Sequence, residues 1–350
     1  MEILSYCFID ENSNIISSKY EDLNLLPASN MKLITGHALY CILGKDYKMN
    51  TKFNIEKNIL YISGDPTPLL TFKELYNISK RLNIKNINDI KFDNIYDDKY
   101  YGDGWSIDDI KFCYSQKIEP YTVNEGCICH NSSFNQKPFD NLHDNNLFPY
   151  NNHKDLFSKF IFYSGSDDGS NDQIIYENTL KNILRHIEIF SCNFSAEVMF
   201  KYLSYIKNGK GTFNESSKII KKFVDSFYGE NDLYIADGSG LSRLNLVNTY
   251  FLSNFIHKIN KNDNEFLHLL PASHGHNGTM KDRFYNLKNY NIMAKTGTLN
   301  HCSLLSGLIE EENISFSIAI NNSNLSEKER EDKIDKLLAN KIKNLNSNHI

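Results

Sequence analysis

Three short apolar runs follow one another closely near the C-terminal end of the chain, and they constrain the fold more than any other feature. They cover residues 292–298, 303–309 and 314–320. Gaps this short leave room only for turns, so the runs predict an antiparallel meander. At the other end, residues 2–10 are apolar and β-prone, and a polar turn at 11–14 leads back into an apolar pair. This N-terminal hairpin can join the meander, which predicts one sheet built from both ends of the chain.

Helical periodicity fills most of the remaining sequence outside residues 45–170. Apolar residues recur at helical spacing from Pro27 to an expected stop at Gly44: Met31, Ile34, Ala38, Cys41 and Ile42. This helix is apolar around much of its circumference, so we expect it to be buried. Further helical patterns cover residues 174–190, 195–207, 214–227, 246–260 and 326–345. Helices mixed with a meander predict an α/β (α+β) fold.

Residues 45–170 have a different texture. Short strand-like runs at 53–55 and 59–62 precede a helical segment at 72–82, and the stretch 131–172 is polar with little periodicity. We therefore predict a split domain formed by residues 1–44 and 171–350, interrupted by a smaller inserted domain at 45–170.

Composition excludes several classes of protein. The chain has 350 residues, with 38 Lys plus Arg and 43 Asp plus Glu, and a net charge of −5. Two domains fit this length. The slight acidity and the absence of a basic patch with interleaved aromatic residues argue against nucleic-acid binding. No apolar run reaches 18 residues, so the sequence predicts no membrane span.

The N-terminus and the cysteines bear on the compartment. The first ten residues lack a basic start, and their apolar stretch is short for a secretory signal, so the literal expectation is a cytoplasmic protein. Seven cysteines show no repeated spacing, so we expect thiols rather than a disulfide framework. Cys127-Ile128-Cys129-His130 is half of a possible metal site, but no second pair follows at zinc spacing. We expect no bound metal.

Ser29-Asn30-Met31-Lys32 places a serine and a lysine three residues apart. On a helix these positions share one face. A serine hydroxyl needs a nearby base to act as a nucleophile, and a lysine can serve when burial keeps it neutral. The alternative interpretation of this segment alone is a helix-capping serine followed by an exposed lysine.

Two further segments carry comparable chemistry. Ser191-Cys192-Asn193 follows a helical run, and it could equally be a helix cap with Ser191 or Asn193 at the N-cap. Lys295-Thr296-Gly297-Thr298 places a cation, two hydroxyls and a glycine in an apolar strand. A glycine inside a strand often marks the close approach of another backbone or a ligand. The alternative is a polar edge strand.

The order Ser-x-x-Lys, Ser-x-Asn, Lys-Thr-Gly is the motif set of penicillin-binding proteins and serine β-lactamases. The sequence resembles the D-alanyl-D-alanine carboxypeptidase/endopeptidase family among them, the low-molecular-mass class C, type-4 group (peptidase family S13). Besides the three motifs, the resemblance rests on Ser63-Gly64-Asp65-Pro66, on the tryptophan segment 104–109, on residues 237–245, and on residues 270–283 and 303–307. It covers most of 20–125 and 174–322, although the insertion is shorter than is usual in the family.

This resemblance implies a β-lactamase/transpeptidase-like domain with a five-stranded antiparallel sheet flanked by helices, and a penicillin-binding serine carboxypeptidase, with possible endopeptidase activity, that needs no cofactor. Ser29 would form the acyl-enzyme and Lys32 would take its proton. Ser191 would relay a proton to the leaving amine, and Asn193 would hold the substrate. Lys295 would tune Ser191 and, with Thr296, Gly297 and Thr298, bind the substrate carboxylate. The N–H groups of Ser29 and Thr298 would form the oxyanion hole.

The implied partners are a peptide ending in D-Ala-D-Ala, as in peptidoglycan stem peptides, and β-lactams; the oligomeric state stays open. The family works outside the cytoplasm, whereas the N-terminus suggests retention, so the localisation also stays open. Two alternatives remain at this stage: an intracellular serine hydrolase of D-amino-acid or other small peptides, and a non-catalytic peptide-binding relative.

Overall fold

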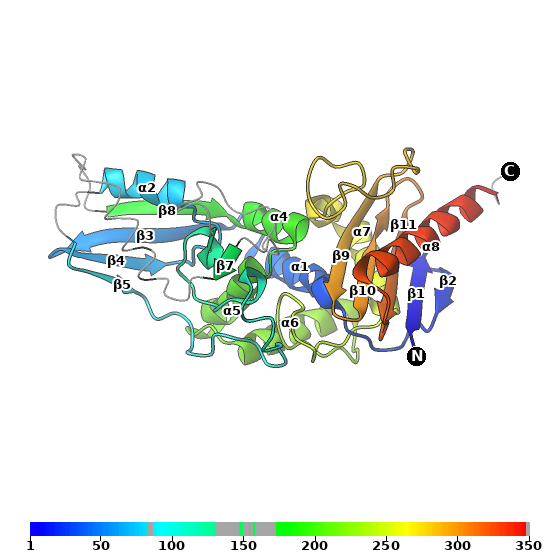
Figure 1. The fold of residues 1–350 in the computed structure, drawn as a ribbon, viewed down its shortest axis with the longest axis horizontal. Coiled ribbons are helices and arrows are strands. Elements are labelled where there is room, and N and C mark those ends of the chain that lie inside the picture. The colour runs from blue at the N-terminus through cyan, green and yellow to red at the C-terminus, as the bar shows by residue number, and fades with distance from the viewer. Residues whose placement is uncertain (83–86, 130–146, 150–153, 155–156, 158–172, 348–350) are drawn as a thin grey trace. The chain divides into compact units, whose positions relative to one another are not determined.

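The computed structural model describes residues 1–350 except 83–86, 130–146, 150–153, 155–156, 158–172 and 348–350 (Figure 1). Two compact units divide these residues. Unit 1 comprises residues 1–38, 185–191 and 220–350, and unit 2 comprises 39–184 and 192–219. The second unit thus includes a helical segment, 192–219, that the sequence interpretation gave to the catalytic domain. The domain boundaries proposed from the sequence stay a prediction.

Unit 1 is organised around a five-stranded antiparallel sheet with the order β2-β1-β11-β10-β9. Its strands are β1 (Ile3–Ile9), β2 (Ile15–Lys19), β9 (Ile292–Leu299), β10 (Cys302–Ile309) and β11 (Ile314–Asn321). β1 pairs with β11 in the register Cys7↔Ser317, which confirms that the N-terminal hairpin joins the C-terminal meander. β9 is an edge strand of this sheet.

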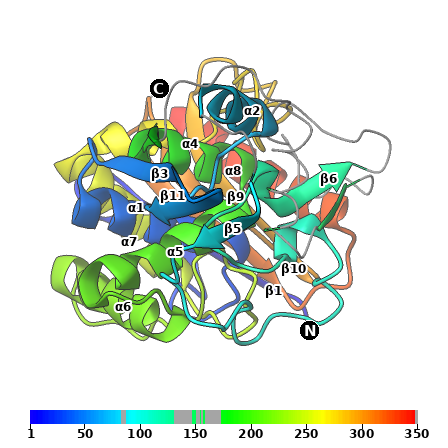
Figure 2. The ribbon, with the colours of Figure 1, turned by 90° about the vertical axis from the view of Figure 1, so that its left-hand side faces the viewer.

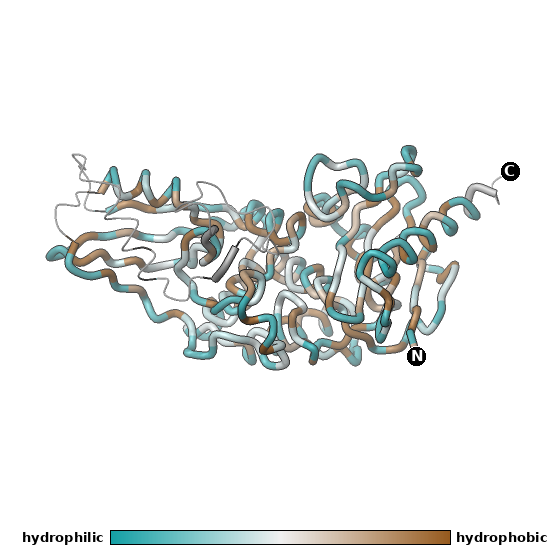
Figure 3. Tube along the Cα trace, viewed as in Figure 1, coloured by the Kyte–Doolittle hydropathy of each residue, from teal (hydrophilic) through white to brown (hydrophobic). Residues whose placement is uncertain are grey.

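Helices cover both faces of the sheet, with α7 (Thr249–Asn262) behind it and α8 (Glu327–Ser347) in front in Figure 1. Side chains alternate between the two faces of a strand. On β1, the Cys7 carbonyl accepts a hydrogen bond from Ser253 of α7, whereas Phe8 packs in the apolar cluster that includes Ile334 and Leu338 of α8. Along α8, Figure 3 shows hydrophobic and hydrophilic residues in alternation, as expected for a helix with one apolar face and one polar face.

The remaining helical segments of unit 1 lead toward the motifs. A 3-10 turn, η1 (Ala28–Asn30), runs into α1 (Met31–Leu43), and α1 ends before Gly44, which has φ +91°. Residues 31–40 of α1 are all buried, which confirms the expectation from its apolar circumference. Three segments complete the set: η4 (Asn264–Leu269), the part of α4 (Leu180–Phe190) from residue 185 onward, and the part of α6 (Phe213–Tyr228) from residue 220 onward.

Unit 2 contains a four-stranded sheet with the order β5-β4-β3-β8, of which β3 and β5 can be followed in Figure 2. Its elements are β3 (Lys48–Glu56), β4 (Ile59–Gly64), α2 (Phe72–Arg81), β5 (Asp89–Phe92), η2 (Cys113–Ser115), η3 (Asn124–Gly126), β6 (Cys127–Cys129), β7 (Leu147–Pro149), β8 (Gln173–Thr179) and α5 (Asn193–Asn208). Asp65 anchors this sheet next to Pro66. Its carboxylate accepts from the Asn50 N–H at 2.6 Å and from the Tyr202 hydroxyl at 2.5 Å.

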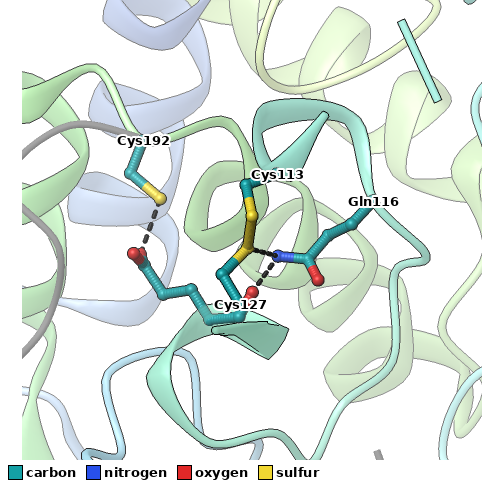
Figure 4. Close-up of a disulfide and its surroundings, with 5 residues drawn as sticks. Cys113, Gln116, Cys127 and Cys192 are labelled. Carbon is teal, nitrogen blue, oxygen red and sulfur yellow. Dashed lines mark hydrogen bonds between the residues drawn. A yellow bond between two sulfur atoms is a disulfide. The ribbon is translucent and has the colours of Figure 1, made fainter. Parts of the chain in front are cut away.

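Two sequence expectations are wrong in unit 2. Residues 174–190 were expected to be one helix, but 173–179 form β8, and the helix begins only at Leu180. The strand forms because it pairs with β3, more than a hundred residues away, and Ile174 is buried against that sheet. The expectation of free thiols also fails at one pair, because Cys113 and Cys127 form a disulfide (Figure 4).

Most of the polar stretch 131–172 lies outside the described residues. Among the helices that are described, none combines the length and apolar character needed to cross a membrane.

Candidate active site

Ser29 and Lys32 meet at the start of α1. The Lys32 Nζ lies 2.8 Å from the Ser29 Oγ, and it donates a second hydrogen bond of 2.8 Å to the Ser239 carbonyl. Lys32 is fully buried, so the alternative of an exposed lysine does not hold. The preceding Ala28 has φ +45°, a left-handed conformation that costs an ordinary residue about 1–3 kcal/mol and clusters at functional sites. The turn thus presents Ser29 directly to a buried amine.

The segment 236–245 supports this amine through a polar network around Asp237. The Asp237 carboxylate accepts from the Gly240 N–H at 2.9 Å, from the Ser242 N–H at 2.6 Å and from the Asn245 side chain at 2.7 Å. All four residues are buried. These bonds fix the backbone that carries the Ser239 carbonyl. The segment therefore acts on the site by holding Lys32.

Two glycines let neighbouring backbones approach Ser29. A Cβ on Gly240 would lie 1.8 Å from the Ala28 carbonyl oxygen, and one on Gly297 would lie 2.6 Å from the Asn30 side-chain nitrogen and 3.1 Å from the Ser29 nitrogen. A side chain at Gly240 would overlap the Ala28 backbone, and one at Gly297 would require the nucleophile turn to shift. The glycine of the Lys-Thr-Gly motif thus marks the close approach of another backbone, as its place in a strand predicted.

Lys295 lies on β9 opposite Ser306 of β10 and is fully buried. Its Nζ donates to the Thr296 carbonyl at 3.3 Å. Burial disfavours the ammonium and the nearby Lys32 repels it, so the pKa of Lys295 is lowered, with Glu188 opposing the shift. A lysine in this setting can change its charge at a pH where an ordinary surface lysine cannot.

β9 has one edge that pairs with no strand of the five-stranded sheet. The Ala294 N–H points away from β10, since it donates to the Pro271 carbonyl at 3.0 Å. Backbone groups point to the same edge at every second residue of a strand. The Thr298 N–H therefore points to that same outer edge. Thr296 and Thr298 are half-buried, and Gly297 between them packs against the turn.

Ser191 and Asn193 lie at the junction of α4 and α5. Ser191 is half-buried with φ +56°, and it belongs to unit 1 with Ser29 and Lys295. The α5 N-cap is Cys192, whose Sγ accepts from the Ser195 N–H at 3.3 Å, so neither Ser191 nor Asn193 caps the helix. Asn193 belongs to unit 2, where its side chain donates to the Tyr114 carbonyl at 3.0 Å.

Unit 2 also holds the surroundings of Cys192, drawn in Figure 4. The Cys192 thiol donates to the Glu125 carboxylate at 2.7 Å, and the Ser195 hydroxyl donates to the same oxygen at 2.8 Å. Gln116 bridges this acid to the disulfide, since its amide contacts the Glu125 carbonyl and the Cys127 sulfur. With Cys127 in a disulfide, the possible metal half-site at 127–130 loses one of its ligands.

Sequence reasoning missed one residue of the site, Glu188 on α4. It is fully buried in unit 1. Burial raises the pKa of its carboxyl, while Lys295 and Lys32 act in the opposite direction. Its place three residues before Ser191 was available in the sequence, but a lone acid in a helical pattern is indistinguishable from a surface residue.

Comparison with known proteins identifies a family for the chain. A model of the D-Ala-D-Ala carboxypeptidase 3 (S13) family matches residues 9–154 and 176–341. A D-alanyl-D-alanine carboxypeptidase from Actinomadura sp. (strain R39) is 30% identical over 115 residues, which are 29% of this chain and 21% of that protein. The chain thus matches about a fifth of the length of this curated relative.

Two solved structures share the fold. Penicillin binding protein 4 from Haemophilus influenzae has a TM-score of 0.77 at 19% identity, with coverage of 93% of this chain and 92% of that one. A predatory peptidoglycan endopeptidase from Bdellovibrio bacteriovorus has a TM-score of 0.62 at 15% identity, with coverage of 99% and 92%. Because each comparison covers more than nine tenths of this chain, the similarity in fold includes both units.

Proposed function

The chain belongs to the D-Ala-D-Ala carboxypeptidase 3 (S13) family, and from that premise we propose that it is a penicillin-binding serine peptidase which cleaves D-Ala-D-Ala-type bonds through an acyl-enzyme on Ser29. One observation carries the proposal: the Lys32 Nζ lies 2.8 Å from the Ser29 Oγ at a fully buried position. A neutral amine there accepts the hydroxyl proton, and burial favours the neutral form.

Acylation follows from this contact. The Ser29 Oγ bonds to the substrate carbonyl carbon while its proton passes to the Lys32 Nζ. The carbonyl oxygen becomes an oxyanion, which the N–H groups of Ser29 and Thr298 bind; one such donor is typically worth about 3 kcal/mol. When the C–N bond breaks, the leaving amine takes a proton through Ser191. Water then attacks the ester carbonyl carbon and gives one proton to the Lys32 Nζ. As the ester bond to the Ser29 Oγ breaks, that proton passes to the Ser29 Oγ and the peptide leaves with a free carboxyl group.

The substrate peptide extends along the outer edge of β9. This strand ends the sheet, and the Thr298 N–H points to its outer edge. An extended peptide can therefore add to this edge by main-chain hydrogen bonds. Its terminal carboxylate binds Lys295 together with the hydroxyls of Thr296 and Thr298. A β-lactam presents the same carbonyl and carboxylate, and it leaves Ser29 acylated.

The test is a covalent adduct. Purified protein is incubated with a fluorescent penicillin and analysed by denaturing gel and intact mass, and release of D-Ala from a short peptide ending in D-Ala-D-Ala is measured in parallel. We expect one adduct on the wild type and none on Ser29→Ala. The matched control is Ser18→Ala, on β2 at the opposite edge of the same sheet, which should label like the wild type.

Three other outcomes would each contradict a different part of the proposal. An adduct that persists on folded Ser29→Ala would refute the assignment of the nucleophile. Labelling without D-Ala release, but with cleavage of other D-amino-acid peptides, would move the proposal to the altered-substrate alternative. Folded wild type that neither labels nor hydrolyses would favour the non-catalytic relative.

A further inference from the structure

Glu188 is a buried acid that the mechanism above does not use. It is fully buried, and neither of its carboxylate oxygens has a hydrogen-bond partner among the described residues. Buried carboxylates are almost always paired or hydrogen-bonded, because removing an unpaired charge from water is expensive. Glu188 therefore requires an explanation from its surroundings.

Two helical elements of unit 1, α1 and η4, lie close to the Glu188 carboxylate. On α1, a Cβ at Gly36 would lie 2.5 Å from a Glu188 oxygen, so only glycine leaves room for the carboxylate one turn after Lys32. The same position would touch the ring of Phe266, from η4, whose titratable Glu265 and His268 are exposed.

The charges that act on Glu188 come from the site itself. Lys32 of α1 and Lys295 of β9 are the groups whose charge favours its ionised form, and both are fully buried. Lys32 and Lys295 in turn repel each other, which lowers the pKa of Lys295. The three side chains thus form one buried electrostatic cluster with two bases and one acid.

The proposed mechanism requires the two lysines of this cluster to be in different protonation states. Lys32 must be neutral to accept the Ser29 proton, while Lys295 must be an ammonium to bind a carboxylate. An ionised Glu188 makes that state neutral overall, because its negative charge balances the single ammonium. Without it, the same state carries one uncompensated buried charge, which a low-dielectric interior strongly disfavours.

We propose that Glu188 is a positioning residue of the acylation centre, a counter-charge that lets Lys295 remain an ammonium while Lys32 is a free base. The inference rests on the proposed acylation of Ser29. It assigns a role to a residue outside the three motifs.

The first test is the pH profile of acylation by a fluorescent penicillin. Its acid limb reports the base that must be neutral, and its alkaline limb reports the ammonium. An opposite charge at close range shifts a pKa by about 1–3 units, so Glu188→Gln should move both limbs toward lower pH by about one unit or more. Glu188→Asp keeps the charge and should bring both limbs back to within about half a unit, on the same principle.

A matched control separates charge balance from general damage. Asp335 on α8 forms an ion pair with Arg283 in the same unit. Asp335→Asn should lower stability and leave both limbs in place. The inference is overturned if Glu188→Gln lowers stability but leaves the limbs where they are, or if Asp335→Asn moves them equally.

The second test does not depend on activity. With carboxyl-labelled glutamate, the Glu188 resonance is identified by its loss in Glu188→Gln, and its titration is followed by NMR. In Lys295→Ala, the carboxyl should titrate at higher pH, because one of the charges that favour its ionised form is gone. An unchanged titration would refute the coupling even in a protein that fails to bind penicillin, whereas a failure to bind penicillin alone would refute only the proposed function.

Discussion

Gly240→Ala tests whether the backbone contact beside the nucleophile holds the site together. Gly240 has φ +87°, and a Cβ there would lie 1.8 Å from the Ala28 carbonyl oxygen and 2.4 Å from the Ala28 carbonyl carbon. Carbon–oxygen contacts are normally no shorter than about 3.3 Å, so the two backbones must separate by roughly 1.5 Å. A flexible side chain could move aside, but a carbonyl within a fixed turn cannot.

The magnitude has two parts. The left-handed conformation costs an alanine about 1–2 kcal/mol. The steric clash adds the cost of overpacking, about 1–3 kcal/mol. The free energy of unfolding should therefore fall by about 2–5 kcal/mol. If the segment moves away instead, the Ser239 carbonyl leaves Lys32, and a misplacement of about 1 Å can lower a rate about a hundredfold.

The assay combines urea unfolding with the rate of acylation by a fluorescent penicillin. Gly229→Ala is the matched control, because Gly229 has φ +89° and nothing within 4 Å of its added Cβ. It should lose only the conformational part and should acylate normally. The reasoning fails if the two variants lose equal stability and acylate at equal rates.

Two further predictions concern stability. Burial among aromatic rings lowers the pKa of His37 to about 4, so as pH falls from about 6.5 the unfolded chain binds a proton first, and about 3 kcal/mol of stability is lost by pH 4. His37→Phe should flatten this part of the curve of unfolding free energy against pH, and an unchanged acid slope would contradict it. The Cys113–Cys127 disulfide closes a loop with a sequence separation of 14, and Cys113→Ser should lower stability in urea by about 3 kcal/mol. Reductant should lower the stability of the wild type but not that of Cys113→Ser. If reductant lowers the stability of both proteins equally, the disulfide is not responsible.

Much of the sheet of unit 1 could be predicted from the sequence, because its strands can be recognised from their own residues and the turns next to them. β9, β10 and β11 are rich in apolar residues and are separated by short turns, and the apolar, β-prone β1 is followed by a polar turn. β8 could not be found in this way. Its residues suit a helix as well as a strand, and only pairing with β3 decides between them.

The same distinction applies to the candidate site. Ser29, Lys32 and Lys295 were identified from their motifs. In the structure the Lys32 amine contacts the Ser29 hydroxyl, and Gly297 of the Lys295 motif packs against the same turn. Ser191 belongs to the same unit. Glu188 was missed because burial, which makes its charge matter, is a property of packing and not of spacing. The Cys113–Cys127 disulfide was missed because its spacing matches no repeated pattern.

The order of the strands has a consequence for biosynthesis. Ile3 pairs with Asn321, so β1 cannot pair with β11 until the ribosome has synthesised the long segment between them. Contacts with such a large sequence separation slow folding, because loop closure precedes any gain from pairing. Until β11 emerges, β1 has an open edge of the kind that recruits other chains. Ser29 likewise lacks the Gly297 backbone until β9 has been synthesised. A chain that terminates before β9 and β11 is therefore prone to aggregation and lacks the backbone that packs on Ser29, so the proposed acylation cannot occur before these strands have been synthesised.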